Sequence, residues 1–145
     1  MGRLDNKVAI ITGAASGMGA ADVRLFVKEG AKVVIADLNE DAGQGLAAEL
    51  GDSALFVRQN VADEDSWNTV VQATLDTFGR IDVLVNNAGI LLMKSLEETT
   101  VDEFNRIMAI NVGGVFFGMK AVAPIMRQQG GGAIINMSSA AGMVG

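Results

Sequence analysis

The stretch "ITGAASGMGAADVRLFVKEGAKVVIADL", residues 11–38, decides the fold. It contains an apolar run, a glycine-rich turn, a helical segment and a second apolar run that ends at Asp37. Glycines let the backbone approach a pyrophosphate closely, and the N-terminus of the following helix offers unpaired N–H groups and the positive end of its dipole. A carboxylate after the second strand can accept hydrogen bonds from both hydroxyls of a ribose. The stretch therefore predicts a β-α-β unit that binds a dinucleotide.

The acidic residue is stronger evidence for this site than the glycines. Gly13, Gly17 and Gly19 follow a G-x3-G-x-G spacing rather than G-x-G-x-x-G, and a glycine-rich turn without a ligand could show the same pattern. Asp37 comes 18 residues after Gly19 and directly after a predicted strand, which favours dinucleotide binding. Its charge would repel a 2′-phosphate, and the sequence places no Arg or Lys in the glycine loop or immediately after Asp37 to offset that charge. We therefore expect NAD in preference to NADP.

Apolar runs of strand length alternate with helical patterns along the rest of the chain. The runs are rich in β-branched residues and almost continuously apolar, as in a parallel sheet covered on both faces. They occupy residues 8–11, 32–36, 54–57, 81–85 and 133–137. Residues 63–79 show one apolar helical stripe, and the capping-box spacing of Thr100 and Glu103 begins a long helix to about Gln129. Right-handed crossovers turn this order into one α/β domain, 1–145, with an open, doubly wound parallel sheet.

Composition limits the classes of function. The chain has 145 residues, the length of one domain, and no apolar run approaches the roughly 20 residues of a bilayer-spanning helix. Its net charge of −6 argues against binding to nucleic acid or anionic lipid. It contains no Cys and no His, so metal-dependent chemistry is not expected. Because the N-terminus also lacks a signal-peptide pattern, we expect a soluble, cytoplasmic protein that binds small molecules.

Two motifs together are typical of a known family. "LVNNAG", residues 84–89, closes the fourth predicted strand, and "TGAASGMG", residues 12–19, opens the first helix. This pair resembles the short-chain dehydrogenase/reductase family, which has a T-G-x3-G-x-G loop and an N-N-A-G strand end. The resemblance covers the whole chain and implies a Rossmann-type sheet with strand order 3-2-1-4-5. In the family, strands 6 and 7 follow, so we expect a dinucleotide-binding domain that is incomplete at its C-terminus.

The resemblance also implies which residues surround the cofactor. They are Gly13, Ser16, Gly17, Met18 and Gly19 at the pyrophosphate and adenosine ribose, Asp37 and Leu38 at the adenosine end, Asn60 and Val61 at the adenine, and Asn87, Ala88 and Gly89 at the nicotinamide ribose. Thr12 is expected to tie the first strand to the N-N-A-G turn by hydrogen bonds. Asn60 replaces the family's frequent Asp, which keeps a hydrogen-bond acceptor but loses its charge, so adenine is expected to be held less firmly.

The chain offers two candidate catalytic residues. Ser138 and Ser139 follow the fifth predicted strand, and because the chain has no His or Cys, neither serine has a conventional base for acyl transfer. A hydroxyl can still donate a hydrogen bond to a substrate carbonyl, and the resemblance assigns this role to Ser139. It also identifies Asn111, in the long helix, as the family's active-site Asn, which positions a water for proton relay. The flanking Ile110 and Val112 predict that Asn111 is buried.

The implied reaction is the NAD-dependent interconversion of a secondary alcohol and a ketone. In the family, a Tyr-x3-Lys motif farther along the chain supplies the proton, whereas these 145 residues contain no Tyr. We therefore expect the chain alone to be inactive. One alternative is a non-catalytic NAD(H)-binding module or pseudoenzyme. Another is an S-adenosylmethionine methyltransferase, in which "NNAG" and the serine pair would have no role.

The predicted surface favours assembly. The fifth strand would be an open sheet edge, and such edges recruit partners. The long helix, 101–129, carries apolar side chains that could form a dimer face. We therefore expect a homo-oligomer or self-association through the helix and the strand edge.

Overall fold

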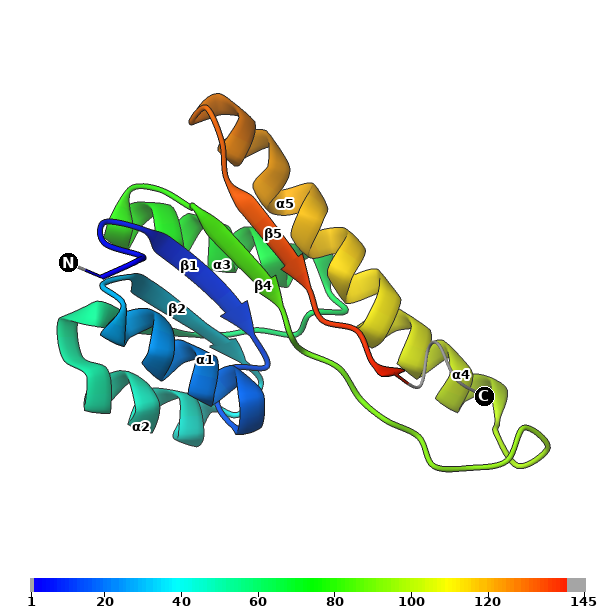
Figure 1. Ribbon diagram of the computed structural model, residues 1–145. Coiled ribbons are helices and arrows are strands. Elements are labelled where there is room, and N and C mark those ends of the chain that lie inside the picture. Colours follow the sequence, from blue (N-terminus) through cyan, green and yellow to red (C-terminus); the bar gives the residue numbers. More distant parts are fainter. Residues whose placement is uncertain (1, 141–145) are drawn as a thin grey trace.

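Five parallel strands form one sheet in the computed structural model, which describes residues 2–140 (Figure 1). The strand order is β3-β2-β1-β4-β5, so the predicted Rossmann-type topology is confirmed. The strands are β1 Val8–Thr12, β2 Lys32–Asp37, β3 Ala54–Arg58, β4 Val83–Asn86 and β5 Ala133–Asn136. Ile10 of β1 pairs with Val34 of β2 and Leu84 of β4, which places β1 at the centre of the sheet.

Helices cover both faces of the sheet. The helices α1, Gly17–Lys28, and α2, Glu40–Leu50, pack on one face, and α3, Glu64–Phe78, and α5, Gly114–Gln128, pack on the other. Successive side chains of a strand point to opposite faces. Ile11 therefore lies in the cluster under α1 and α2, whereas Ile10 lies in the cluster under α3 and α5. A turn of 3-10 helix, η1, Gly51–Ser53, connects α2 to β3.

The long helix is present but is not uniform. It begins with α4, Val101–Met108, continues through a π-helical turn, η2, Ala109–Gly113, and ends with α5. Thr100 and Glu103 form the predicted capping box, in which each side chain accepts a hydrogen bond from the other residue's backbone N–H. The sequence did not predict the π-helical turn, because the contact that accompanies it is made with a distant loop. Figure 1 shows α4 projecting beyond the carboxyl ends of the strands.

The helical stretch Val101–Gln128 is also notable for its apolar composition. By length and composition alone it could cross a membrane, although helices of soluble proteins often meet the same description. Part of it covers the sheet, since Val122 and Met126 of α5 are buried against β1 and β4. The stretch is therefore weak evidence for a membrane span.

The edge formed by β5 is exposed. Within residues 2–140, β5 pairs with β4 on one side only, because β3 and β5 are the two edges of the sheet. Ile135 and Met137 have exposed side chains there. The β5 edge offers unpaired strand backbone, and exposed apolar side chains lie both there and on the projecting α4.

Candidate functional site

A cavity of about 170 Å³ lies at the carboxyl ends of the strands. It is lined by residues that follow β1, β2, β3 and β4, together with residues of α4 and η2. The strand order reverses between β1 and β4, and ligands of open α/β sheets bind outside the carboxyl ends of the strands at such a switch point. The cavity gathers these residues of the predicted cofactor set: Gly13, Asp37, Leu38, Asn60, Val61, Ala88 and Gly89.

Two glycines let the loop after β1 pack against the N-N-A-G turn. Gly13 has a positive φ of 61°, and a Cβ there would lie 2.9 Å from the Ala88 Cα. A Cβ on Gly19 would meet the Gly13 carbonyl oxygen. Gly17 differs, because a Cβ there would have nothing within 4 Å. The loop is thus tightly held on its inner side and open at Gly17, as a cradle for a diphosphate at the start of α1 would be.

Thr12 connects the end of β1 to the same turn. Its Oγ1 accepts hydrogen bonds from the backbone N–H groups of Asn87, at 3.1 Å, and Ala88, at 3.0 Å. In return, the Asn87 amide nitrogen donates to the carbonyl oxygens of Thr12, at 2.9 Å, and Gly13, at 3.2 Å. The hydrogen bonds expected of Thr12 are therefore present. They fix the N-N-A-G turn relative to the glycine loop.

Asp37 joins the glycine loop to the start of α2. One carboxylate oxygen accepts from the Ala15 N–H and the other from the Asn39 N–H, both at 2.9 Å. Each oxygen of a carboxylate has two lone pairs, so each can accept a further hydrogen bond from a ligand. Asp37 is half-buried at the mouth of the cavity. Its position fits a group that holds a ribose and is itself held in place by two backbone amides.

Asn60, in the connection after β3, lines the cavity and also holds its own loop. The Asn60 Oδ1 accepts a hydrogen bond from the Ala62 N–H at 3.1 Å, so the side chain forms a local turn. Sequence reasoning missed the preceding residue, Gln59, which lines the cavity and is buried. Its amide nitrogen and oxygen have no hydrogen-bond partner within residues 2–140. Gln59 is therefore a buried amide without a partner in the part of the chain that the structure describes.

Asn111 is held by the loop that follows the N-N-A-G turn. Its amide nitrogen donates to the Ile90 carbonyl and its Oδ1 accepts from the Ile90 N–H, both at 2.9 Å. The expected burial of Asn111 is only half right, because the residue is half-buried and Val112 is 54% exposed. At η2, Val112 is turned outward, whereas Ile110 lines the 170 Å³ cavity. Asn111 thus anchors the loop that forms one wall of the cavity.

The candidate catalytic serines lie near a second cavity, between α5 and the end of β5. A cavity of about 380 Å³ there is lined by Asn111 and Ser138, together with Asn136 of β5. Asn136 also accepts a hydrogen bond from the Asn86 side chain at 2.9 Å. Ser139 is exposed and does not line this cavity. The structure therefore brings Asn111 together with Ser138, and Ser139 comes next along the chain.

Sequence reasoning also missed cavity residues that packing brings in from α4 and η2. Arg106 and Ile110 line the 170 Å³ cavity, as does Ile90. Arg106 and Ile110 are four residues apart, so a helix places both on one face. The sequence does not show that this face points toward the cavity. Of the apolar residues 90–93, Ile90 lines this cavity.

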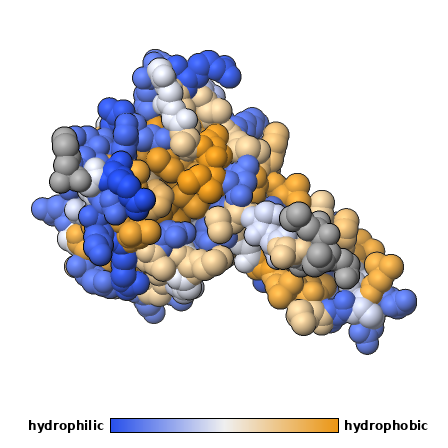
Figure 2. All heavy atoms as spheres, viewed as in Figure 1, coloured by the Kyte–Doolittle hydropathy of each residue, from blue (hydrophilic) through white to orange (hydrophobic). Residues whose placement is uncertain are grey.

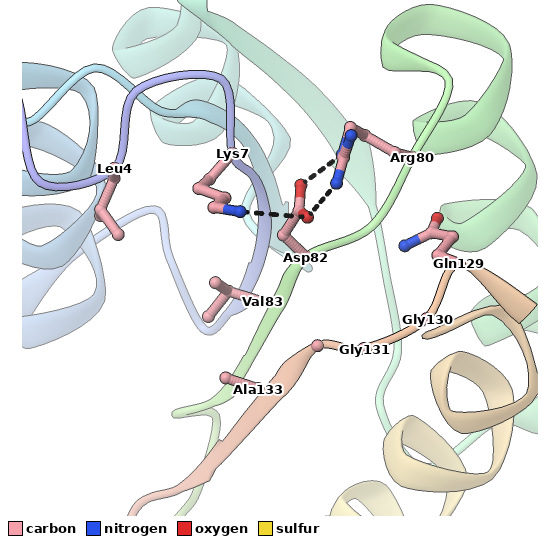
Figure 3. A pocket seen from close by; sticks show the side chains of 10 residues that line it. Leu4, Lys7, Arg80, Asp82, Val83, Gln129, Gly130, Gly131 and Ala133 are labelled. Carbon is pink, nitrogen blue, oxygen red and sulfur yellow. Dashed lines mark hydrogen bonds and ion pairs between the residues drawn. The ribbon is translucent and has the colours of Figure 1, made fainter. Parts of the chain in front are cut away.

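A larger cavity, of about 410 Å³, lies at the amino ends of the strands (Figure 3). Asp82 is its charged centre: the Arg80 guanidinium donates to both carboxylate oxygens, at 2.7 and 2.8 Å, and the Val8 N–H donates at 2.9 Å. Lys7 approaches at 3.9 Å. Burial raises the pKa of the Asp82 carboxyl, but these hydrogen bonds outweigh burial and bring the pKa below its ordinary value. This arrangement joins β1 to β4 and is structural.

Comparison with known proteins gives consistent matches. The profile of the short chain dehydrogenase family matches residues 7–145. A 2,5-dichloro-2,5-cyclohexadiene-1,4-diol dehydrogenase of Sphingobium indicum is 46% identical over 97% of this chain and 58% of its own length. A 3-alpha-(or 20-beta)-hydroxysteroid dehydrogenase of Mycobacterium tuberculosis is 45% identical over 99% of this chain and 55% of its own length. The chain therefore spans little more than half the length of these curated relatives.

A solved structure resembles the fold as well. The 3-ketoacyl-(acyl-carrier-protein) reductase from Brucella melitensis, complexed with NADH, superposes with a TM-score of 0.85 and 41% sequence identity. The match covers 88% of this chain and 53% of the reductase. The two chains therefore share the sheet and the helices on both of its faces.

Proposed function

The chain belongs to the short-chain dehydrogenase/reductase family, and from that premise we propose that it binds NAD(H) and serves the interconversion of a secondary alcohol and a ketone by hydride transfer. The observation that carries this proposal is the cavity at the carboxyl ends of the strands, which gathers Gly13, Asp37 and Ala88 from the ends of β1, β2 and β4. The matching relatives are dehydrogenases, and the similar reductase holds NADH, which supports the same chemistry here.

The residues of the site fit NAD(H). The open space at Gly17 admits a diphosphate to the N-terminus of α1, where the helix dipole is positive. Asp37 is poised to accept hydrogen bonds from the adenosine ribose and repels a 2′-phosphate, so NAD(H) is preferred over NADP(H). When bound, the nicotinamide ring gives or accepts the hydride. Thr12 and Asn87 keep the wall beside it rigid.

The chain's own contribution to the chemistry is to position the substrate and a water. Ser139 donates a hydrogen bond to the substrate carbonyl, and Ser138 packs beside it. Ile90 uses one of the two N–H donors and one of the two lone pairs of the Asn111 amide, so the amide keeps capacity for a water. The 145 residues contain no Tyr, and the loss of a positioned general acid costs roughly 10²- to 10⁴-fold in rate. This polypeptide alone is therefore inactive or nearly so.

A second candidate function is a non-catalytic NAD(H)-binding module or pseudoenzyme. Both candidates bind the cofactor and differ in turnover. For both candidate functions we place the protein in the cytoplasm. The substrate of the dehydrogenase would be a small alcohol or ketone. The exposed apolar face of α4 and η2 and the β5 edge make it self-associate.

Calorimetric titration of NADH and NADPH into the polypeptide and its Asp37→Ala variant tests the proposal. Wild type is expected to bind NADH at least about ten-fold more tightly than NADPH, because the carboxylate gains hydrogen bonds from one ribose and repels the phosphate of the other. Asp37→Ala is expected to lose that preference. Absence of heat from either nucleotide with the folded wild type would contradict the proposal.

A further inference from the structure

Met18 places a thioether in the open at the start of α1. It is the second residue of the helix and is 64% exposed. Glycines flank it on both sides, so no side chain at position 17 or 19 shields the sulfur. The chain contains no Cys, so methionine thioethers are its only sulfur groups. Because exposure increases the susceptibility of sulfur side chains to oxidants, Met18 is open to oxidation in the unliganded protein.

The first turn of α1 leaves its backbone donors free. The first N–H groups of a helix have no partner inside the helix. In α2, α3 and α4 a side chain accepts from one of these groups, namely Asn39, Asp63 and Thr100. At α1, Ser16 makes no such hydrogen bond within residues 2–140, and the first turn has no acidic residue. These donors are therefore left for an acceptor from outside the helix, and in the proposed function that acceptor is the diphosphate.

Oxidation would give Met18 an acceptor of its own. Hydrogen peroxide transfers one oxygen atom to Sδ: an S–O bond forms, the O–O bond breaks and water leaves. The sulfur loses the two electrons that the peroxide gains, and the product is methionine sulfoxide, whose side chain is polar.

The sulfoxide oxygen would be long enough placed on its side chain to reach the helix N-terminus. It is as many bonds from the backbone as a Glu carboxylate oxygen. Glu103, in the first turn of α4, shows this reach, because its carboxylate accepts from the Thr100 N–H at 3.0 Å. An oxygen on the Met18 sulfur is therefore within range of the free N–H groups of α1.

We infer that Met18 is an oxidative modification site at which sulfoxide formation weakens binding of the dinucleotide. The sulfoxide oxygen competes with the diphosphate for the N–H groups at the start of α1. This inference rests on the proposed NAD(H) site and adds a response to peroxide to it. A bound dinucleotide covers the thioether, so occupancy of the site and oxidation of Met18 oppose each other. Reduction of the sulfoxide by a methionine sulfoxide reductase restores binding.

Calorimetric titration of NADH into untreated and peroxide-treated protein tests the inference, and peptide mass spectrometry measures the oxidised fraction of Met18. Treated wild type is expected to bind NADH at least about five-fold more weakly than untreated wild type. Met18→Leu, which has a similar volume and no sulfur, is expected to have the same affinity before and after treatment. Met93→Leu removes a thioether that is 85% exposed between β4 and α4, and treatment is expected to weaken its binding as in wild type.

Protection by the cofactor is a second readout. Saturating NAD during the peroxide treatment is expected to slow the oxidation of Met18 and to leave that of Met93 unchanged. Equal rates of Met18 oxidation with and without NAD, in a protein that calorimetry shows to bind it, would contradict the inference.

The outcomes separate the inference from the proposed function. Unchanged NADH affinity in wild type that carries the Met18 sulfoxide overturns the inference, as does an equal loss of affinity in Met18→Leu, and both leave the NAD(H) site standing. No binding of NADH by the untreated protein overturns both. The melting temperature without ligand is expected to be the same before and after treatment, because Met18 is exposed. A large fall would show that oxidation acts by unfolding the protein, and would also overturn the inference.

Discussion

At the scale of single residues, Asp82 carries the clearest electrostatic signature. Its carboxylate is buried between Arg80 and Lys7 and joins two strands through the Val8 N–H (Figure 3). We expect Asp82→Asn to lower the free energy of unfolding by about 1–2 kcal/mol at neutral pH, because Asn keeps the shape but cannot accept from every donor. Urea titration measures this change. Glu49→Gln, which breaks the exposed ion pair with Arg24, is the control and should leave the stability almost unchanged.

The same residue predicts a pH dependence. Folding lowers the pKa of Asp82 below its ordinary 3.8, so the carboxylate stabilises the folded state above that pH. The contribution is lost as the pH falls through the lowered pKa. The gap between wild type and Asp82→Asn should therefore narrow in urea titrations below about pH 4. A gap that stays constant from neutral pH into that range would show that the charge of Asp82 does not stabilise the fold.

Residues of the cavity show how far sequence alone can reach. Asp37 and Gly13 are predictable because their roles depend on spacing along the chain and on strand ends. Gln59, Arg106 and Ile110 are not, because their position in the cavity follows from packing between segments that are distant in the sequence. The sequence also did not show that the Asn60 Oδ1 accepts a hydrogen bond from the Ala62 N–H.

At the scale of elements, the close contact between α5 and β4 depends on a glycine. A Cβ on Gly118 would lie 2.6 Å from the Asn86 Oδ1 and 2.6 Å from a ring carbon of the buried Trp67. We expect Gly118→Ala to lower the free energy of unfolding by about 1–3 kcal/mol, since neither neighbour has room to move. The chemical denaturation midpoint is the measurement.

A matched substitution serves as the control for Gly118. Gly45 lies within α2, and a Cβ there would have nothing within 4 Å. Gly45→Ala should therefore raise the free energy of unfolding by about 0.5–1 kcal/mol through helix propensity. If both alanines had the same effect, the close approach of α5 to β4 would not be what requires Gly118.

Elements divide into those that the sequence predicts and those that it does not. The open parallel sheet follows from apolar runs, helical stripes and right-handed crossovers, whereas its strand order was implied by the family resemblance. Thr100 with Glu103 marks the start of α4. The π-helical turn η2 escapes prediction because it coincides with the contact between Asn111 and Ile90, which lie far apart in the sequence. The sequence does not predict the close contact at Gly118 either, because it joins segments that lie far apart in the chain.

At the scale of the whole molecule, apolar surface gathers on the part that projects from the sheet. Phe104 and Met108, one helical turn apart on α4, are 56% and 41% exposed. Figure 2 shows apolar side chains over this projecting part. We expect the protein to self-associate at micromolar concentration, because contiguous exposed apolar surface of this kind marks interaction sites.

Light scattering tests that association. The double variant Phe104→Glu and Met108→Glu should shift the average mass toward the monomer. Leu25→Glu, which places the same charge on an exposed apolar position of α1, should leave the mass of the assembly unchanged. A wild-type protein that stays monomeric over this concentration range would remove the role assigned to the α4 face.

The central claim is that a dinucleotide occupies the carboxyl ends of the strands, and Trp67 reports on it most directly. Trp67 is the only tryptophan of the chain, and its indole N–H donates to the carbonyl of Val61, a cavity residue, at 3.0 Å. NADH titrated into the protein should quench Trp67 emission in a saturable way, and the bound NADH should show sensitised emission. ADP-ribose, which competes for the same site, should reverse both changes. Trp67 emission that is unaffected by NADH, once absorption by the nucleotide is corrected, would contradict the account.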